Sequence, residues 1–191
     1  MIAQDGSFFL KNKLSASETY EAILARHGMK MIEARADAKP GEEQKKFSMH
    51  AFGAQFAEVR VDPDLGEVRV TRWVGTFGVG RVLNAKTANT QLIGGIVYGI
   101  GMALMEHTVT DPHRGRVVNA DLAEYHVPVN ADVSDIQVLF VDEHDPHINP
   151  LGVKRIGEIR ITGTAAAIAN AVSHATGKRI RDLPITLDKL L

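Results

Sequence analysis

One segment of the sequence places a carboxylate directly after a glycine. Residues 152–158 read Gly-Val-Lys-Arg-Ile-Gly-Glu, and we expect Glu158 to lie where a loop meets a helix. Glycine lets the backbone approach a ligand closely, and its N–H group can donate a hydrogen bond to that ligand. The approaching helix N-terminus favours an ionised carboxylate, the form that a general base requires. Glu158 is therefore a candidate general base; the alternative is an ordinary acidic residue at a helix start.

A second segment concentrates glycine in an apolar helix. Residues 91–101 read Gln-Leu-Ile-Gly-Gly-Ile-Val-Tyr-Gly-Ile-Gly. Each glycine costs a helix roughly 1 kcal/mol relative to alanine, so close packing against another element or against a ligand should offset the cost. Gln91 is then either a cofactor contact or a buried or capping amide. The glycine spacing does not match Gly-x-Gly-x-x-Gly, which argues against a dinucleotide-binding fold.

Two further groups of residues suggest chemistry less strongly. Residues 142–147, Asp-Glu-His-Asp-Pro-His, hold several side chains that can bind a metal. No zinc spacing such as His-Glu-x-x-His occurs there, and the polar composition is typical of a solvated loop. A zinc site or hydrolase that uses His144 and His147 is the alternative. Ser173 and His174 are neighbours in a predicted helix and cannot form a catalytic dyad.

The pattern of residues around these segments predicts an α+β fold. Residues 47–61 and 67–74 flank a turn at 62–66 and predict an antiparallel hairpin, followed by a glycine loop at 75–80. Residues 84–105 predict a long helix, residues 134–141 another strand, and a final helix, capped by Thr162 or Thr164, runs to Gly177. This order predicts a mixed, partly antiparallel sheet with helices packed on one face.

The N-terminal part of the sequence is less regular. Residues 17–28 predict a short amphipathic helix that Ser15 or Ser17 caps and Gly28 ends. Residues 36–46 are polar, contain Pro-Gly, and predict a loop or linker. We therefore expect an N-terminal helix and linker segment over residues 1–46 and a C-terminal domain over residues 47–191.

The composition excludes several classes of protein. The 191 residues carry a net charge of −1, which predicts neither nucleic acid nor an anionic membrane as a partner. No cysteine is present, so this chain ligates no iron–sulfur cluster and performs no thiol catalysis. The longest apolar stretch, residues 92–105, is too short to span a bilayer. No secretory signal is visible, so we expect a cytoplasmic protein, or a periplasmic one if a partner subunit exports it.

Several segments, taken in order, resemble the molybdopterin-binding large subunit of the xanthine dehydrogenase and aldehyde oxidoreductase family. Residues 152–158 are similar to that family's active-site motif, commonly Gly-x-Lys-Gly-x-Gly-Glu. Residues 80–84, followed by residues 91–101, resemble its cofactor-contacting segment. The other similar segments are residues 51–62, 123–128, 165–172 and 181–186. The resemblance extends from about residue 47 to the last residue. The part of the family's large subunit that these residues resemble is its C-terminal part.

The resemblance implies a fold like that family's molybdenum cofactor-binding domain and a hydroxylation that takes oxygen from water. The substrate would be an aldehyde or an N-heterocycle. Glu158 would be the catalytic base, the N–H group of Gly157 would lie near the metal's ligands, and Gln91 would hydrogen-bond the pterin. The cofactor would be molybdopterin, with or without a cytosine dinucleotide, and no side chain of this chain would ligate the metal. Electrons would leave through 2Fe–2S clusters and FAD on partner subunits.

The sequence also departs from the family's pattern. Arg155 stands where the motif commonly has glycine or alanine, and Arg160 where glycine is common, which leaves the substrate class open. The family's large subunit is several times longer than this chain. We therefore expect the isolated chain to be incomplete and inactive without the remaining large-subunit regions, the iron–sulfur subunit and the FAD subunit. The alternative is a truncated, non-catalytic domain that acts as a structural or interaction module.

Overall fold

The computed structural model describes residues 1–37, 41–133 and 135–191, which fall into two compact units, Met1–Lys39 and Pro40–Leu191. Each unit is described by itself. Part of the linker predicted over residues 36–46, and the first residue of the strand predicted over residues 134–141, lie outside the described residues. The division into domains at residue 47 stays a prediction.

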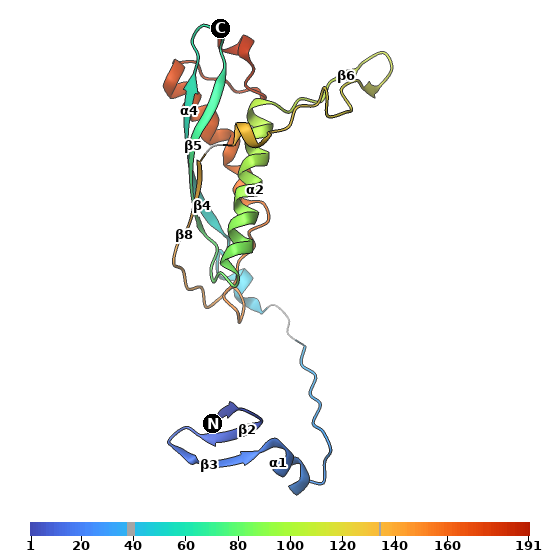
Figure 1. Ribbon diagram of the computed structural model, residues 1–191, viewed down its shortest axis with the longest axis vertical. Helices are drawn as coiled ribbons and strands as arrows, with labels where there is room; N and C mark the ends of the chain where they lie inside the picture. The colour runs from blue at the N-terminus through green and yellow to red at the C-terminus, as the bar shows by residue number, and fades with distance from the viewer. Residues whose placement is uncertain (38–40, 134) are drawn as a thin grey trace. The chain divides into compact units, whose positions relative to one another are not determined.

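The first unit is a small antiparallel sheet with one helix (Figure 1). Strands β1 (Ile2–Gln4), β2 (Ser7–Leu10) and β3 (Lys13–Thr19) pair in that order, and helix α1 (Tyr20–Arg26) follows. The sequence analysis predicted the helix but not the strands. It was also wrong about the cap, because Ser15 and Ser17 lie in β3 and Thr19 caps α1 by accepting a hydrogen bond from the Ala22 N–H (3.1 Å).

The second unit is built on a three-stranded mixed sheet in the order β4–β5–β8. Strands β4 (Phe52–Val61) and β5 (Val68–Gly78) form the predicted antiparallel hairpin, and β8 (Asp135–Phe140) pairs with β5 in parallel. The turn forms because the Asp62 carboxylate accepts from the N–H groups of Asp64 and Leu65 (both 2.9 Å). Gly66 then takes a positive φ of 69°.

The glycine loop predicted over residues 75–80 is mostly strand. Gly75 and Gly78 belong to β5, and only Gly80 has a positive φ, 66°. A Cβ at Gly75 would lie 2.7 Å from the Phe77 ring, and one at Gly78 would lie 2.5 Å from the Phe52 ring. These glycines make room for aromatic rings on the sheet, so the signal for close approach was right and the inference of a loop was wrong.

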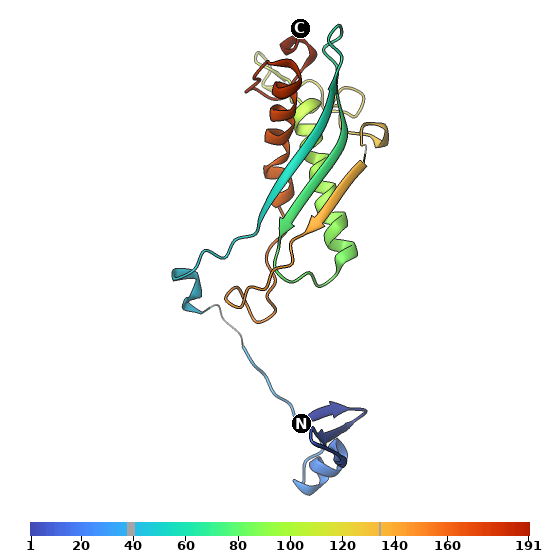
Figure 2. The same cartoon turned by 90° about the vertical axis from the view of Figure 1, so that its left-hand side faces the viewer.

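Two helices cover one face of this sheet (Figure 2). Helix α2 (Ala85–Leu104) begins at Asn84, whose side chain accepts from the Thr87 N–H (3.1 Å), and α4 (Thr164–Thr176) ends at Gly177 with a φ of 76°. The core between sheet and helices buries Trp73, Phe77, Leu92, Ile96, Ile100, Ile168 and Val172. Each such large apolar side chain contributes about 1.5–3 kcal/mol when it leaves water. The predicted α+β fold with helices on one face is confirmed.

The predicted cap of the final helix is wrong. A short helix, α3 (Ile159–Thr162), precedes α4, and Gly163 separates the two. The Thr164 hydroxyl lies 2.7 Å from the carbonyl oxygen of Arg160 and caps nothing. The short elements that remain are η1 (Glu42–Lys45), β6 (Thr110–Asp111), β7 (Arg116–Val117), η2 (Asn130–Asp132) and η3 (Leu187–Lys189).

The other face of the sheet carries exposed apolar side chains. Phe56 on β4 is 64% exposed and Leu139 on β8 is 45% exposed. Phe52 at the start of β4 is also exposed. Within the part of the chain that the structure describes, no helix is long and apolar enough to cross a membrane.

Candidate functional site

Glu158 lies at the junction that the sequence predicts. It occupies the residue before α3, and both Glu158 and Gly157 are exposed. Among the described residues, none forms a hydrogen bond or ion pair with the Glu158 side chain. The carboxylate is therefore available to a group that this chain does not contain.

Gln91 lies on the first half of α2 and is exposed. Arg160 offers only donors, which assigns the amide oxygen of Gln91 to the side facing the guanidinium. In this orientation the oxygen accepts from Nη1 (2.6 Å) and Nη2 (2.9 Å) of Arg160. Nη1 also donates to the carbonyl oxygen of Ile156 (3.0 Å). Arg160 thus joins α2 to the segment that leads into Gly157 and Glu158.

A hollow of about 370 Å³ lies beside this network. Gln91 and Ile156 both line it, so the structure brings the helix and the loop segment to one concave surface. Glu158 and Gly157 do not line it, although they follow Ile156 directly in the chain. The other lining residues are Val79, Arg81, Val82, Leu83, Asn84, Thr87, Ala88, Val153 and Lys154.

The glycines of α2 fall into two kinds. A Cβ at Gly95 would lie 1.9 Å from Nε of Arg160, and one at Gly99 would lie 2.3 Å from Cβ of Thr164. Close packing within the chain therefore explains both. Gly94, in contrast, has nothing within 4 Å of its Cβ position, and the same holds for Gly157. Of the chain's 17 glycines, these are the two that have neither a positive φ nor a neighbour in that space.

The loop at residues 142–147, which the sequence predicts to be solvated, contributes to a buried cluster of ion pairs. The sequence analysis did not predict this cluster. The Lys154 side chain is only 5% exposed, and its ammonium group forms ion pairs with Glu143 and, at 3.3 Å, with Asp145. Glu143 also accepts from the N–H group of Gly80 (3.0 Å). From the sequence, a run of charged residues predicts a solvated loop. The spacing does not show that Lys154, eleven residues after Glu143, folds back and pairs with it.

The cluster perturbs the pKa of two of its members. Burial alone would lower the pKa of Lys154, but the contacts with Glu143 and Asp145 outweigh burial and raise that pKa above its ordinary value. The N–H group of His147 and the Lys154 ammonium hold the pKa of Asp145 below its ordinary value. Both groups are therefore charged over a wide pH range, and the ion pair between them is maintained over that range.

Backbone hydrogen bonds anchor the same segment. The N–H group of Lys154 donates to the Val79 carbonyl (3.1 Å), and that of Arg81 donates to the Gly152 carbonyl (2.8 Å). The segment before Glu158 is thus bound by its backbone to the residues that follow β5, and by the Lys154 side chain to Glu143 and Asp145.

The zinc alternative gains no support from the geometry. Within residues 1–37, 41–133 and 135–191, no three side chains of the kind that hold a metal come together. Asp145, which lies between His144 and His147 in this loop, is paired with Lys154.

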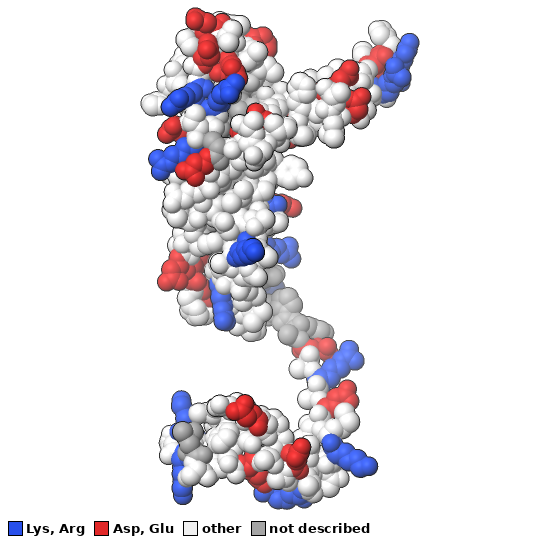
Figure 3. Space-filling model, viewed as in Figure 1, with Lys and Arg blue, Asp and Glu red and all other residues white. Residues whose placement is uncertain are grey.

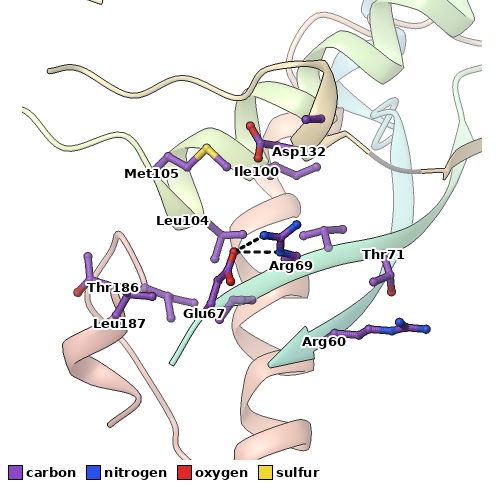
Figure 4. Close-up of a pocket in the computed structure, with 14 residues that line it drawn as sticks. Arg60, Glu67, Arg69, Thr71, Ile100, Leu104, Met105, Asp132, Thr186 and Leu187 are labelled. Carbon is purple, nitrogen blue, oxygen red and sulfur yellow. Dashed lines mark hydrogen bonds and ion pairs between the residues drawn. The ribbon is translucent and has the colours of Figure 1, made fainter. Parts of the chain in front are cut away.

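A larger hollow, of about 570 Å³, lies elsewhere on the second unit (Figure 4). It is lined by the start of β5, the end of α2, η2 and the C-terminal segment. Glu67 and Arg69 form an ion pair of 2.7 Å at its edge. Leu104 and Met105 line it at the end of α2 opposite to Gln91, about 20 Å away at 1.5 Å per residue. None of the predicted site residues lies there.

One protein-family model matches most of the chain. Residues 1–134 match the model of the molybdopterin cofactor-binding domain. The chain belongs to this family. The match with the molybdopterin cofactor-binding domain spans parts of both units and includes Gln91, while Gly157 and Glu158 lie beyond it.

Two relatives of this chain are named as molybdenum-binding subunits. It is 48% identical over 151 residues to the aldehyde oxidoreductase molybdenum-binding subunit PaoC of Escherichia coli (strain K12), covering 79% of this chain and 21% of that subunit. It is 38% identical over 140 residues to the putative xanthine dehydrogenase molybdenum-binding subunit XdhA of the same strain, covering 73% and 18%. The chain thus spans about a fifth of the length of these relatives.

A solved structure agrees. The aldehyde oxidoreductase from Desulfovibrio gigas superposes with a TM-score of 0.67 at 30% identity, over 74% of this chain and 15% of that one. The resemblance to the xanthine dehydrogenase and aldehyde oxidoreductase family is therefore confirmed, as is the cofactor-binding fold.

Proposed function

We propose that this chain forms the cofactor-facing part of a molybdenum hydroxylase, with Glu158 as the general base. The enzyme would oxidise an aldehyde or an N-heterocycle and take the oxygen from water. The observation that carries the proposal is the exposed, unpaired carboxylate of Glu158 at the end of an anchored segment. The family and the names of the relatives support the class of reaction.

The residues fit a pterin-bound metal. Gly94 and Gly157 leave open space on two elements that Arg160 joins, and a Cβ at either position would project into that space. The exposed face of α2 carries no charged side chain after Lys86, and Figure 3 shows the middle of this unit largely without charges. The chain has no cysteine, which agrees with a metal held by the dithiolene of its own cofactor.

Glu158, Gly157, Gln91 and Arg160 have different roles in the proposed reaction. Glu158 accepts a proton at its carboxylate, which no described side chain competes for. Gly157 offers its N–H group toward the ligands of the metal. Gln91 hydrogen-bonds the pterin, and Arg160 fixes the amide by binding its oxygen, which directs the NH₂ end away from Arg160. When bound, the cofactor supplies the two-electron oxidation.

The proposal includes partners. The chain spans about a fifth of its relatives, so the remaining large-subunit regions would complete the pocket. An iron–sulfur subunit and a FAD subunit would carry the electrons away. The cofactor would be molybdopterin, with or without a cytosine dinucleotide. We propose a cytoplasmic location, or a periplasmic one if a partner subunit exports the complex.

The test is to complement the chain with the remaining regions of its large subunit and measure aldehyde oxidation. Loss of a general base lowers the rate by about 10²–10⁴-fold, so Glu158→Gln should lose activity by that factor. Its molybdenum content should stay at the wild-type level, and its stability should change by less than about 0.5 kcal/mol because the side chain is exposed. Glu124→Gln, which changes another exposed glutamate, is the matched control. Full activity in Glu158→Gln would remove the assignment.

A second candidate is a non-catalytic structural or interaction module. The small share of the relatives that the chain spans, and the exposed apolar face of its sheet, favour this candidate for the chain alone. Metal and pterin analysis of the purified chain separates the two. Stoichiometric molybdenum and pterin in the isolated chain would reject the module.

A further inference from the structure

A groove of about 520 Å³ lies next to the anchored segment, inside the second unit. One wall comes from residues 44–51, in and after η1, and the other from residues 148–155 on either side of Lys154. The lining residues are Gln44, Phe47, Met49, His50, Ala51, Ile148, Asn149, Val153 and Arg155. Neither the proposed base nor the hollow beside Gln91 uses the residues that give the groove its charge.

A ring contact joins the two walls of the groove, and hydrogen bonds of Asn149 hold the second wall in shape. The Phe47 ring stacks on the His147 ring with centroids 4.0 Å apart and planes 14° apart. The Asn149 oxygen accepts from the N–H groups of Leu151 (3.0 Å) and Val153 (3.2 Å), and its nitrogen donates to the Val153 carbonyl (2.7 Å). The shape of the groove is therefore fixed without help from its remaining polar side chains.

Those remaining side chains are Arg155, His50 and Gln44. Within the described ranges of the chain, none of their side chains forms a hydrogen bond or ion pair. No aspartate or glutamate lines the groove, so nothing in its lining neutralises the Arg155 guanidinium. Phe47, Met49 and Ile148 give the groove an apolar wall. The groove thus combines a positive charge with a surface for a small apolar group.

We propose that this groove binds a small organic carboxylate, with the guanidinium of Arg155 pairing with the carboxylate. The planar guanidinium matches a carboxylate in a two-bond arrangement. His50 and Gln44 can add further donors, and the wall of Phe47, Met49 and Ile148 contacts a ring or short aliphatic chain. The apolar wall should make organic carboxylates bind more tightly than inorganic anions, because an inorganic anion has no apolar group that could contact the wall.

The groove lies close to the proposed base in the chain. Arg155 precedes Glu158 by three residues, which span at most about 10 Å of backbone. That distance suits a molecule whose anionic end sits at Arg155 and whose other end reaches toward Glu158. Binding to the groove is nonetheless a property of this chain by itself, and it does not rest on molybdenum chemistry.

Titration of the ¹⁵N-labelled chain with sodium benzoate tests the proposal. We expect saturable shifts in the amide signals of residues 44–51 and 148–155, with a Kd on the order of 1 mM for so small a ligand in an open groove. Benzyl alcohol keeps the ring without the charge and should bind about two- to fivefold more weakly, the contribution of an exposed ion pair. Inorganic phosphate keeps charge without the ring and should also bind more weakly.

Variants identify the residue responsible. Arg155→Gln should weaken benzoate binding about two- to fivefold, while Arg72→Gln, which changes an exposed arginine on β5 outside the groove, should leave it unchanged. The unliganded spectrum of each variant reports whether it is folded, and Arg155→Lys provides a second variant that keeps the charge and should bind between the two. Absence of saturable shifts at about 10-fold the expected Kd, equal binding of phosphate, or wild-type binding by Arg155→Gln would each overturn the proposal.

Discussion

The two sides of helix α2 use glycine in different ways. On the packed side, Gly95 and Gly99 lie against Arg160 and Thr164, and a larger residue would collide with them. On the other side, Gly94 has no described atom within 4 Å of its Cβ position, so no packing within the described residues offsets the roughly 1 kcal/mol that glycine costs a helix. Tight packing within the chain therefore explains Gly95 and Gly99 but not Gly94. Lys154 and Glu158 repeat the contrast within one loop, one buried and paired and the other exposed and unpaired.

The largest effect is expected at Lys154. Lys154→Met should destabilise the chain by about 3 kcal/mol, because it leaves Glu143 and Asp145 mostly buried without their cation. Urea unfolding of the 191-residue chain measures the change. Lys86→Met, at an exposed lysine of α2, is the matched control and should cost less than about 0.5 kcal/mol. A cost below about 1 kcal/mol for Lys154→Met would mean that the cluster does not anchor the loop.

Gly99→Ala should come next, with a loss of about 1–2 kcal/mol. The new methyl group would lie 2.3 Å from Cβ of the fully buried Thr164, and overpacking of this kind costs more than the gain in helix propensity. The same unfolding experiment measures it. Stability equal to or above that of the wild type would show that Thr164 can move aside, and the packed side would then be no tighter than the exposed side.

Acid should weaken the Lys154 cluster by a smaller amount, since protonation of Asp145 removes one partner of Lys154 whereas Lys154→Met removes the cation itself. The pKa of Asp145 is lowered in the folded chain, so its contribution is present above the unfolded value of about 3.9 and is lost as pH falls through the folded value. Unfolding free energy measured from pH 6 to pH 2 should fall less steeply below about pH 4 in Asp145→Asn than in the wild type. Parallel curves would contradict the lowered pKa.

The smallest effect has the opposite sign. Gly94→Ala should stabilise the chain by about 0.5–1 kcal/mol, because alanine is the better helix former and no described atom lies within 4 Å of the new methyl group. The shift in the urea midpoint at constant slope measures the gain. A loss of stability would show that the chain itself occupies this space, and the contrast between the two sides of α2 would disappear.

Local patterns in the sequence predicted much of the second unit. The alternation in residues 67–74 identified the hairpin, and Asn84 before an apolar run identified the start of α2. β1 to β3 were missed because they are short and mostly exposed, so they lack the apolar alternation of a half-buried strand. Gly75 and Gly78 suggested a loop because sequence alone does not show which ring fills the space beside a glycine.

The sequence identified candidate residues for the site, but it did not predict the contacts that these residues and their neighbours form. The motif in residues 152–158 drew attention to Glu158, yet the lysine in the same motif is the residue that the fold buries. Its partners lie in the preceding loop, and the hydrogen bond between Arg160 and Gln91 joins two helices. Long-range pairs of this kind depend on the tertiary fold. The roles of Glu158, Gly157 and Gln91 stay predictions.

The burial of Lys154 has an entropic consequence for the carboxylate four residues later. A fixed point at Lys154 limits Glu158 to a sphere with a radius of about 14 Å, the length of four extended residues. Ordering Glu158 in a completed pocket would therefore cost less conformational entropy than ordering the end of an unanchored loop.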